Sequence, residues 1–241
     1  MRFQTFKGDC LEVMAQLPDA SVDMILCDLP YGTTACKWDT VIPFDALWAQ
    51  YRRVAKRNAA IVLTASQPFT TALIASNMRE FRYCWVWEKT RATGFQHANR
   101  LPMRAHEDIA IFCGRGRYNP QGLIECNKKN KRGSPGENWQ RNPDVCNEYV
   151  QLKTNFPRSV VKFASEGGLH PTQKPVALME YLIRTYTEKG DVVLDNCMGS
   201  GTTGVACANQ GRKFIGIEKD EAYYDLAAQR VAAAYANDGL N

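Results

Sequence analysis

Short apolar runs alternate along the chain with longer stretches of helical character. The runs are bounded by Asp, Gly or Pro, as strands buried in a parallel sheet are. We predict strands at 3–6, 22–27, 59–63, 83–87, 107–113, 191–195 and 213–217. We predict helices at 10–16, 44–55, 69–76 and 175–188, with a last helix after Glu218. This alternation is typical of parallel βα units and predicts an α/β fold.

The second apolar run leads into the most informative loop, Asp28-Leu29-Pro30-Tyr31. Ligands of open α/β sheets bind at the carboxyl ends of strands, and this loop follows such an end. It offers a carboxylate, a main-chain carbonyl and an aromatic face. A flat ring with an exocyclic amine would donate to Asp28 and to the Leu29 carbonyl while Tyr31 stacks on the ring. On these four residues alone, an ordinary turn is an equal alternative.

A second loop near the C-terminus has the composition of a nucleotide-cofactor site. The predicted strand ending at Asp195 is followed by Gly199, Gly201 and Gly204 and then by a predicted helix. Glycines let a ligand approach the main chain, and a helix N-terminus favours an anionic group. The next strand ends at Glu218, a carboxylate suited to ribose hydroxyls. The pattern fits both NAD and S-adenosylmethionine, and a tight turn without a ligand is the third possibility.

Three ordered motifs resemble the β-class of amino-methylating DNA methyltransferases, of prophage or bacterial type. They are the Asp28 loop, His170-Pro171-Thr172-Gln173-Lys174-Pro175, and the glycine-rich loop after Asp195. The resemblance implies a Rossmann-like, seven-stranded, mostly parallel methyltransferase sheet with an inserted target-recognition region. It implies a catalytic half at 1–113, the insertion at 114–165, and a cofactor-binding half at 166–241. It also places 107–113 in an antiparallel hairpin at the edge of the sheet.

The same resemblance implies the site residues. The catalytic residues are Asp28, Leu29, Pro30 and Tyr31, and the cofactor is S-adenosyl-L-methionine. Within the cofactor site, the resemblance assigns Asp9 to adenine, Glu218 to ribose, and Lys174 with two threonines to the methionine carboxylate. The full set of cofactor-binding residues is Asp9, Cys10, Lys174, Asp195, Cys197, Gly199, Gly201, Thr202, Thr203 and Glu218. Leu29 stands where the family has proline, and Cys197 where it has phenylalanine.

Charge is unevenly distributed over the 241 residues, whose net charge is +5. Residues 114–165 hold ten Lys or Arg against four Asp or Glu, so the rest of the chain is nearly neutral. A basic insertion on a neutral body indicates phosphate contacts, although a solvated loop has the same composition. Its turn-rich sequence shows little strand or helix periodicity. The DNA-binding residues we predict there are Lys128, Lys129, Lys131 and Arg132.

Cysteine usage and hydropathy exclude other classes of protein. The nine cysteines show no CxxC spacing, which favours reduced thiols, and we predict no metal site. No run of 18 apolar residues and no signal peptide is apparent, so we expect a cytoplasmic protein without membrane contact. Double-stranded DNA is the expected partner, and family resemblance adds a homodimer.

These observations together predict a site-specific DNA methyltransferase that modifies the N6 amine of adenine after base flipping, as in restriction-modification. N4-cytosine presents an exocyclic amine to the same geometry and stays an alternative. A catalytically inactive DNA-binding relative and an NAD-dependent oxidoreductase are the other two hypotheses.

Overall fold

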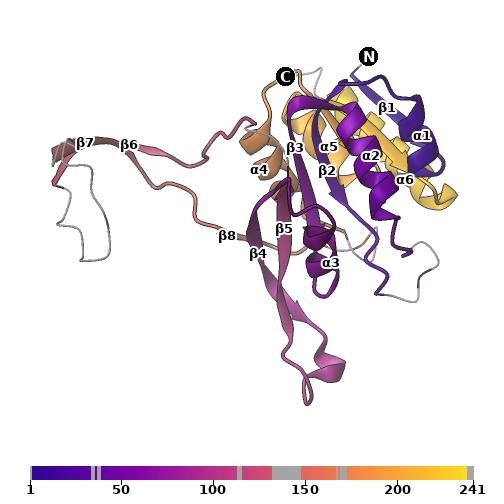
Figure 1. Cartoon of the computed structure of the whole chain (residues 1–241), viewed down its shortest axis with the longest axis horizontal. Coiled ribbons are helices and arrows are strands. Elements are labelled where there is room, and N and C mark those ends of the chain that lie inside the picture. The colour runs from indigo at the N-terminus through magenta and orange to yellow at the C-terminus, as the bar shows by residue number, and fades with distance from the viewer. Residues whose placement is uncertain are drawn as a thin grey trace. The chain divides into compact units, whose positions relative to one another are not determined.

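The computed structural model describes residues 2–33, 36, 39–112, 116–131, 148–166, 168 and 173–237 (Figure 1). The chain forms two compact units. One contains residues 1–119 and 159–241, and the other contains residues 120–158. The second unit lies inside the range 114–165 expected for the insertion; its role in target recognition stays a prediction.

The first unit is built on one sheet, which has eight strands in the described part of the chain. Their order is β1-β10-β9-β2-β3-β5-β4-β8. The bounds are β1 Phe3–Lys7, β2 Val22–Asp28, β3 Ala55–Ala65, β4 Phe81–Thr93, β5 Arg104–Phe112, β8 Val160–Phe163, β9 Val192–Asp195 and β10 Lys213–Glu218. Among these strands β5 is antiparallel to both neighbours, and the other pairings are parallel. The predicted α/β class with a mostly parallel sheet is confirmed.

Two details of the predicted sheet are wrong. The sheet has one strand more than the seven expected, because Val160–Phe163 pairs with β4. This strand has four residues, none of them fully buried, so its apolar pattern is weak. β5 is also not at the edge, since it lies between β3 and β4. Residues Ile109–Phe112 of β5 are buried. This burial is typical of a strand that has a neighbour on each side and a packed layer on both faces of the sheet.

Helices cover both faces of the sheet and form two apolar cores. Helices α1 Cys10–Gln16, α2 Phe44–Val54 and α3 Phe69–Ser76 pack on one face, and α4 Val176–Tyr186, α5 Thr202–Asn209 and α6 Glu221–Asn237 pack on the other. Strand β2 alternates between the cores, with Ile25 in the first and Met24 in the second. Trp85 and Trp87 of β4 are buried in the second core.

The second unit contains a two-stranded antiparallel hairpin of β6 Ile124–Lys131 and β7 Glu148–Thr154. The sequence predicts little strand character here, and for these two segments that prediction is wrong. In β7, Val150 and Leu152 alternate with polar residues over only four positions, and both side chains are exposed, so the sequence signal of this strand is weak. Lys128, Lys129 and Lys131 lie on β6, whereas Arg132 lies outside the described residues.

Candidate active site

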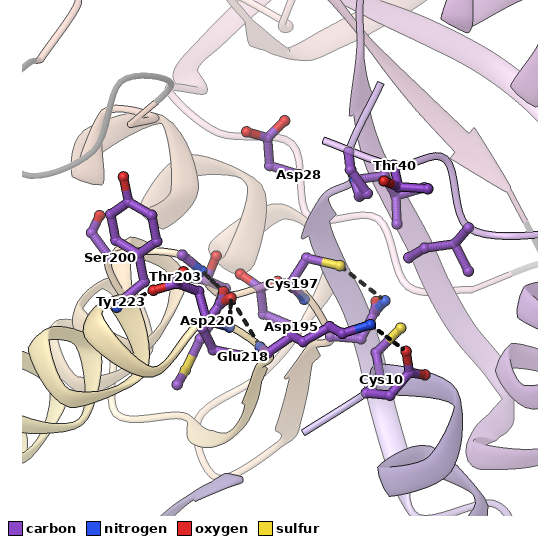
Figure 2. Close-up of a pocket in the computed structure, with 18 of the residues that line it drawn as sticks. Cys10, Asp28, Thr40, Asp195, Cys197, Ser200, Thr203, Glu218, Asp220 and Tyr223 are labelled. Carbon is purple, nitrogen blue, oxygen red and sulfur yellow. Dashed lines mark hydrogen bonds and ion pairs between the residues drawn. The ribbon is translucent and has the colours of Figure 1, made fainter. Parts of the chain in front are cut away.

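The carboxyl ends of β2 and β9 lie side by side where the connectivity of the sheet reverses. Met24 pairs with Val193 and Ile25 with Leu194, so the loops after Asp28 and Asp195 open on the same edge. A cavity of about 460 Å³ lies there (Figure 2). All predicted catalytic and cofactor-binding residues line it except Tyr31 and Gly201. The two halves of the predicted site therefore share one cavity.

Three donors hold the Asp28 carboxylate in place. Oδ1 accepts hydrogen bonds from the Tyr31 hydroxyl at 2.6 Å and from the Thr64 hydroxyl, whose residue pairs with Asp28 across β2 and β3. Oδ2 accepts from the Lys174 ammonium at 2.5 Å. These donors come from separate segments of the chain, so the orientation of the carboxylate is fixed before any ligand binds.

Lys174 contacts the Asp28 carboxylate, and its predicted role at the methionine carboxylate of the cofactor stays a prediction. Its side chain is 6 % exposed, and Nζ is also 3.3 Å from Glu107 Oε2. Lys89 pairs with the other oxygen of Glu107. Burial lowers the pKa of Lys174, but Asp28 and Glu107 outweigh burial and raise the pKa overall. Lys174 is therefore a buried cation shared by two carboxylates.

The ring of Tyr31 lies close to both Phe69 and the Lys174 ammonium, whose Nζ is 5.7 Å from the ring centroid. Its ring stacks on Phe69 with centroids 5.0 Å apart and an angle of 25° between the rings. Burial, with the nearby carboxylates of Asp28 and Glu107, raises the pKa of Tyr31 well above its ordinary value. The hydroxyl therefore stays protonated and donates to Asp28. The stacking of Tyr31 on a flipped base stays a prediction.

Three contact residues were not found from the sequence: Thr64, Glu107 and Lys89. They belong to β3, β5 and β4, and strand register brings them to the loop, so no spacing in the sequence marks them. One signal was available for Glu107, which directly precedes Asp108 and a run of buried apolar residues. An acidic residue at the end of a buried strand is expected at the edge of the sheet where Asp28 and Asp195 also lie.

The glycines of the second loop have different tasks. The Gly199 N–H donates to Glu218 Oε2 at 2.8 Å, and this glycine lines the cavity. Gly201 caps α5 with φ +79°, and a Cβ there would come within 3.1 Å of side-chain atoms of Ala227 and Val231 in α6. Gly201 thus permits close packing of α5 on α6 and does not face the cavity.

The acids of the cofactor half are held by main-chain N–H groups. Glu218 Oε1 accepts from Lys219 and Asp220 at 2.9 Å, in addition to the bond of Oε2 with Gly199. Burial raises the pKa of Glu218. Asp195 accepts from the Cys197 N–H at 3.1 Å, and burial raises its pKa to about 6. Asp9 caps α1 through a bond from the Leu11 N–H at 3.0 Å.

Other predicted residues belong to the second unit or lie outside the described residues. Lys128, Lys129 and Lys131 belong to the second unit. His170, Pro171 and Thr172 lie outside the described residues. Within the described part of the chain, no three His, Cys, Asp or Glu side chains form a candidate metal site. No helix of that part is long and apolar enough to cross a membrane.

The sequence model of a DNA methylase family, the N6_N4_Mtase family, matches residues 22–229. The chain belongs to this family of DNA methyltransferases. It is similar to the Type II methyltransferase M2.DpnII of Streptococcus pneumoniae, with 26 % identity over 243 residues, covering 94 % of this chain and 88 % of the relative.

Solved structures agree with the fold. The M1.HpyAVI-SAM complex superposes with a TM-score of 0.64 and 26 % identity, covering 95 % of this chain and 98 % of that one. The cytosine-N4-specific PvuII DNA methyltransferase superposes with a TM-score of 0.67 and 16 % identity, covering 99 % and 93 %. The likeness to the latter concerns the fold alone. The described fold is therefore that of a Rossmann-like methyltransferase.

Proposed function

We propose that the protein transfers the methyl group of S-adenosyl-L-methionine to the N6 amine of adenine at a specific site in double-stranded DNA. The observation that carries this proposal is the single cavity that joins the Asp28 loop to the Gly199 and Glu218 end of the sheet. Membership of a DNA methylase family and similarity to a protein solved with SAM support it. A DNA substrate also fits the cytoplasmic location that the sequence predicts.

The residues of the cofactor half fit this cofactor. Oε1 of Glu218 already accepts two main-chain bonds, whereas Oε2 accepts one and keeps acceptor capacity for a ribose hydroxyl. Thr202 and Thr203 open α5, whose N-terminus favours a carboxylate. Gly199 allows close approach of a ligand to the main chain. When bound, the cofactor supplies a methyl group on an electrophilic sulfonium.

Asp28 and Leu29 prepare the amine of the target base. The lone pair of a ring amine is delocalised, so catalysis has to localise it. By accepting both N–H bonds, Asp28 and the Leu29 carbonyl favour a pyramidal nitrogen whose lone pair points away from both acceptors. Lys174 holds one oxygen of Asp28 in place, while Thr64 and Tyr31 hold the other. The proton leaves the nitrogen after methyl transfer.

The DNA side of the proposal rests on charge. Lys128, Lys129, Lys131 and Arg132, in the basic segment 114–165, are proposed to bind phosphates and to contribute to target recognition. Tyr31 is proposed to stack on the flipped base. Similarity to a Type II methyltransferase supports a role in restriction-modification. A homodimer belongs to the same proposal, and sedimentation of the purified protein tests it.

The test is methyl transfer from tritiated S-adenosylmethionine to unmethylated genomic DNA, followed by nucleoside analysis. We expect the label in N6-methyladenine. Label in N4-methylcytosine would agree with the proposed mechanism but would show that the target base is cytosine. DNA and cofactor binding without any transfer would contradict the proposal and favour the inactive relative.

A further inference from the structure

The β4 and β5 strands continue beyond the sheet as a two-stranded projection (Figure 1). We call residues 88–106 the β4–β5 arm. The pairing of β5 with β3 ends where Asp108 meets Ala65, and the pairing of β4 with β8 ends at Lys89. Past these points the two strands pair with no other described strand. Within the described chain, the outer part of the arm is therefore free on both edges.

The arm leaves the sheet beside the catalytic loop. Asp28 pairs with Thr64, and the next residue of β3, Ala65, pairs with Asp108 of β5. Glu107, one residue further toward the arm, contacts Lys174, the cation that binds Asp28. The root of the arm is thus part of the active-site edge.

The arm is positively charged. Its 19 residues hold four Lys or Arg and a single acid, Glu88, which pairs with Lys162 outside the arm. Arg91, Arg100 and Arg104 are exposed, and none of them forms an ion pair with another described residue. Three exposed cations that have no carboxylate partner in the described chain complement a polyanion.

The outer end of the arm exposes large apolar side chains. Gly94 adopts φ +91° and leads into a short 3₁₀ turn, Phe95–His97, at which the chain reverses. Phe95 is 80 % exposed and Leu101 is 63 % exposed. An aromatic ring held at the end of a charged ribbon is a feature of surfaces that insert into a partner.

We propose that the β4–β5 arm lies in a DNA groove beside the target base, with its arginines on phosphates and Phe95 in the base stack next to the extruded adenine. This inference rests on the proposed function. A two-stranded ribbon fits the major groove, and apolar side chains that enter a stack are a known means of unstacking DNA. A second protein chain is the less suitable occupant, because a symmetric pairing would bring two positive arms together.

The first test measures the salt dependence of binding to duplex DNA by the full-length protein. Simultaneous replacement of Arg91, Arg100 and Arg104 by Ala should weaken binding. It should also reduce the slope of log K against log salt concentration by roughly 0.9 for each phosphate that the variant no longer neutralises. Arg57→Ala is the matched control, because Arg57 is exposed near the amino end of β3, away from the arm. Its slope should equal that of the wild type.

The second test addresses Phe95. It uses a duplex with a site that the wild type methylates, found by sequencing methylated genomic DNA. Phe95→Ala should slow transfer to the paired adenine roughly ten- to hundredfold, the effect expected for removal of one stacking ring. The defect should largely disappear when the adenine faces an abasic position, because extrusion then costs less. Met78→Ala, which removes a side chain 61 % exposed before β4, should change neither rate.

Several outcomes would overturn the inference. One is a triple variant whose slope equals that of the wild type, and another is a Phe95→Ala defect of equal size on both duplexes. A third outcome is a wild type that sediments as a dimer and a triple variant that sediments as a monomer, with the same salt-dependence slope for DNA binding. The arm would then bind a second copy of the chain and not DNA. If the wild type transfers no methyl group, the proposed function fails, and the salt slopes still report whether the arm binds DNA.

Discussion

Replacing Lys174 distinguishes its observed position at Asp28 from the predicted position at the cofactor carboxylate. Nζ lies 2.5 Å from Asp28 Oδ2 and 3.3 Å from Glu107 Oε2, and the side chain is 6 % exposed. Lys174→Met keeps most of the side-chain volume and removes the charge. Asp28 then loses its cation, whereas Glu107 keeps its ion pair with Lys89.

The size of the effect follows from the loss of this ion pair. Removal of one partner of a buried ion pair costs roughly 3–5 kcal/mol, and the lower figure applies here because Asp28 is 24 % exposed. A loss of that size in the positioning of Asp28 lowers kcat roughly 100-fold. Lys174→Arg, which retains the charge, should restore part of the activity.

The assay compares kcat at saturating cofactor and DNA with the Kd for S-adenosylmethionine from calorimetry. We expect a large fall in kcat with a Kd within about threefold of the wild type. A Kd raised tenfold or more, with kcat preserved at saturation, would refute this reasoning and place Lys174 on the cofactor carboxylate. Lys56→Met is the matched control: this exposed lysine, 2.7 Å from Asp23, lies near the amino ends of the strands. It should leave both quantities unchanged.

Two further predictions concern stability in the absence of ligand. Burial raises the pKa of Asp195 from 3.8 to about 6. The folded protein therefore loses stability as the pH rises from 3.8 to about 6, because the carboxyl group ionises less readily in the folded state than in the unfolded state. Asp195→Asn should therefore gain stability over the wild type as pH rises from about 4 to 7, by up to about 3 kcal/mol. Parallel urea-unfolding stabilities at all pH values would contradict this. Gly201→Ala should lose roughly 1–3 kcal/mol more than Gly190→Ala in the same assay. Both glycines have positive φ, but only Gly201 has neighbours within 4 Å of an added Cβ. Equal losses would show that α5 and α6 tolerate the methyl group.

Local sequence patterns were sufficient for the parts of the site that lie on single loops. Asp28 follows a buried strand directly, and the Gly199 loop follows another, so strand-end reasoning put both at one edge of the sheet. The contacts of Asp28 were different. Thr64 and Glu107 reach it through pairing of distant strands, and no local pattern encodes that register.

Other contacts of the predicted site residues also depend on distant parts of the chain. The buried ammonium of Lys174 pairs with two carboxylates that come from other strands. Gly201 packs on α6. The cofactor roles of both residues stay predictions. In the second unit, Val150 and Leu152 of β7 alternate with polar residues over only four positions, and both side chains are exposed. A pattern read from burial therefore could not find that strand.

The most direct test of the central claim is to compare methyl transfer to DNA with cofactor binding for Asp28→Ala. Asp28 is proposed to act on the target amine, and Gly199 and Glu218, which line the same cavity, are proposed to hold the cofactor. The account predicts that the variant folds, binds S-adenosylmethionine with an affinity close to that of the wild type, and forms no N6-methyladenine. Methylation at the wild-type rate by the folded variant would contradict it.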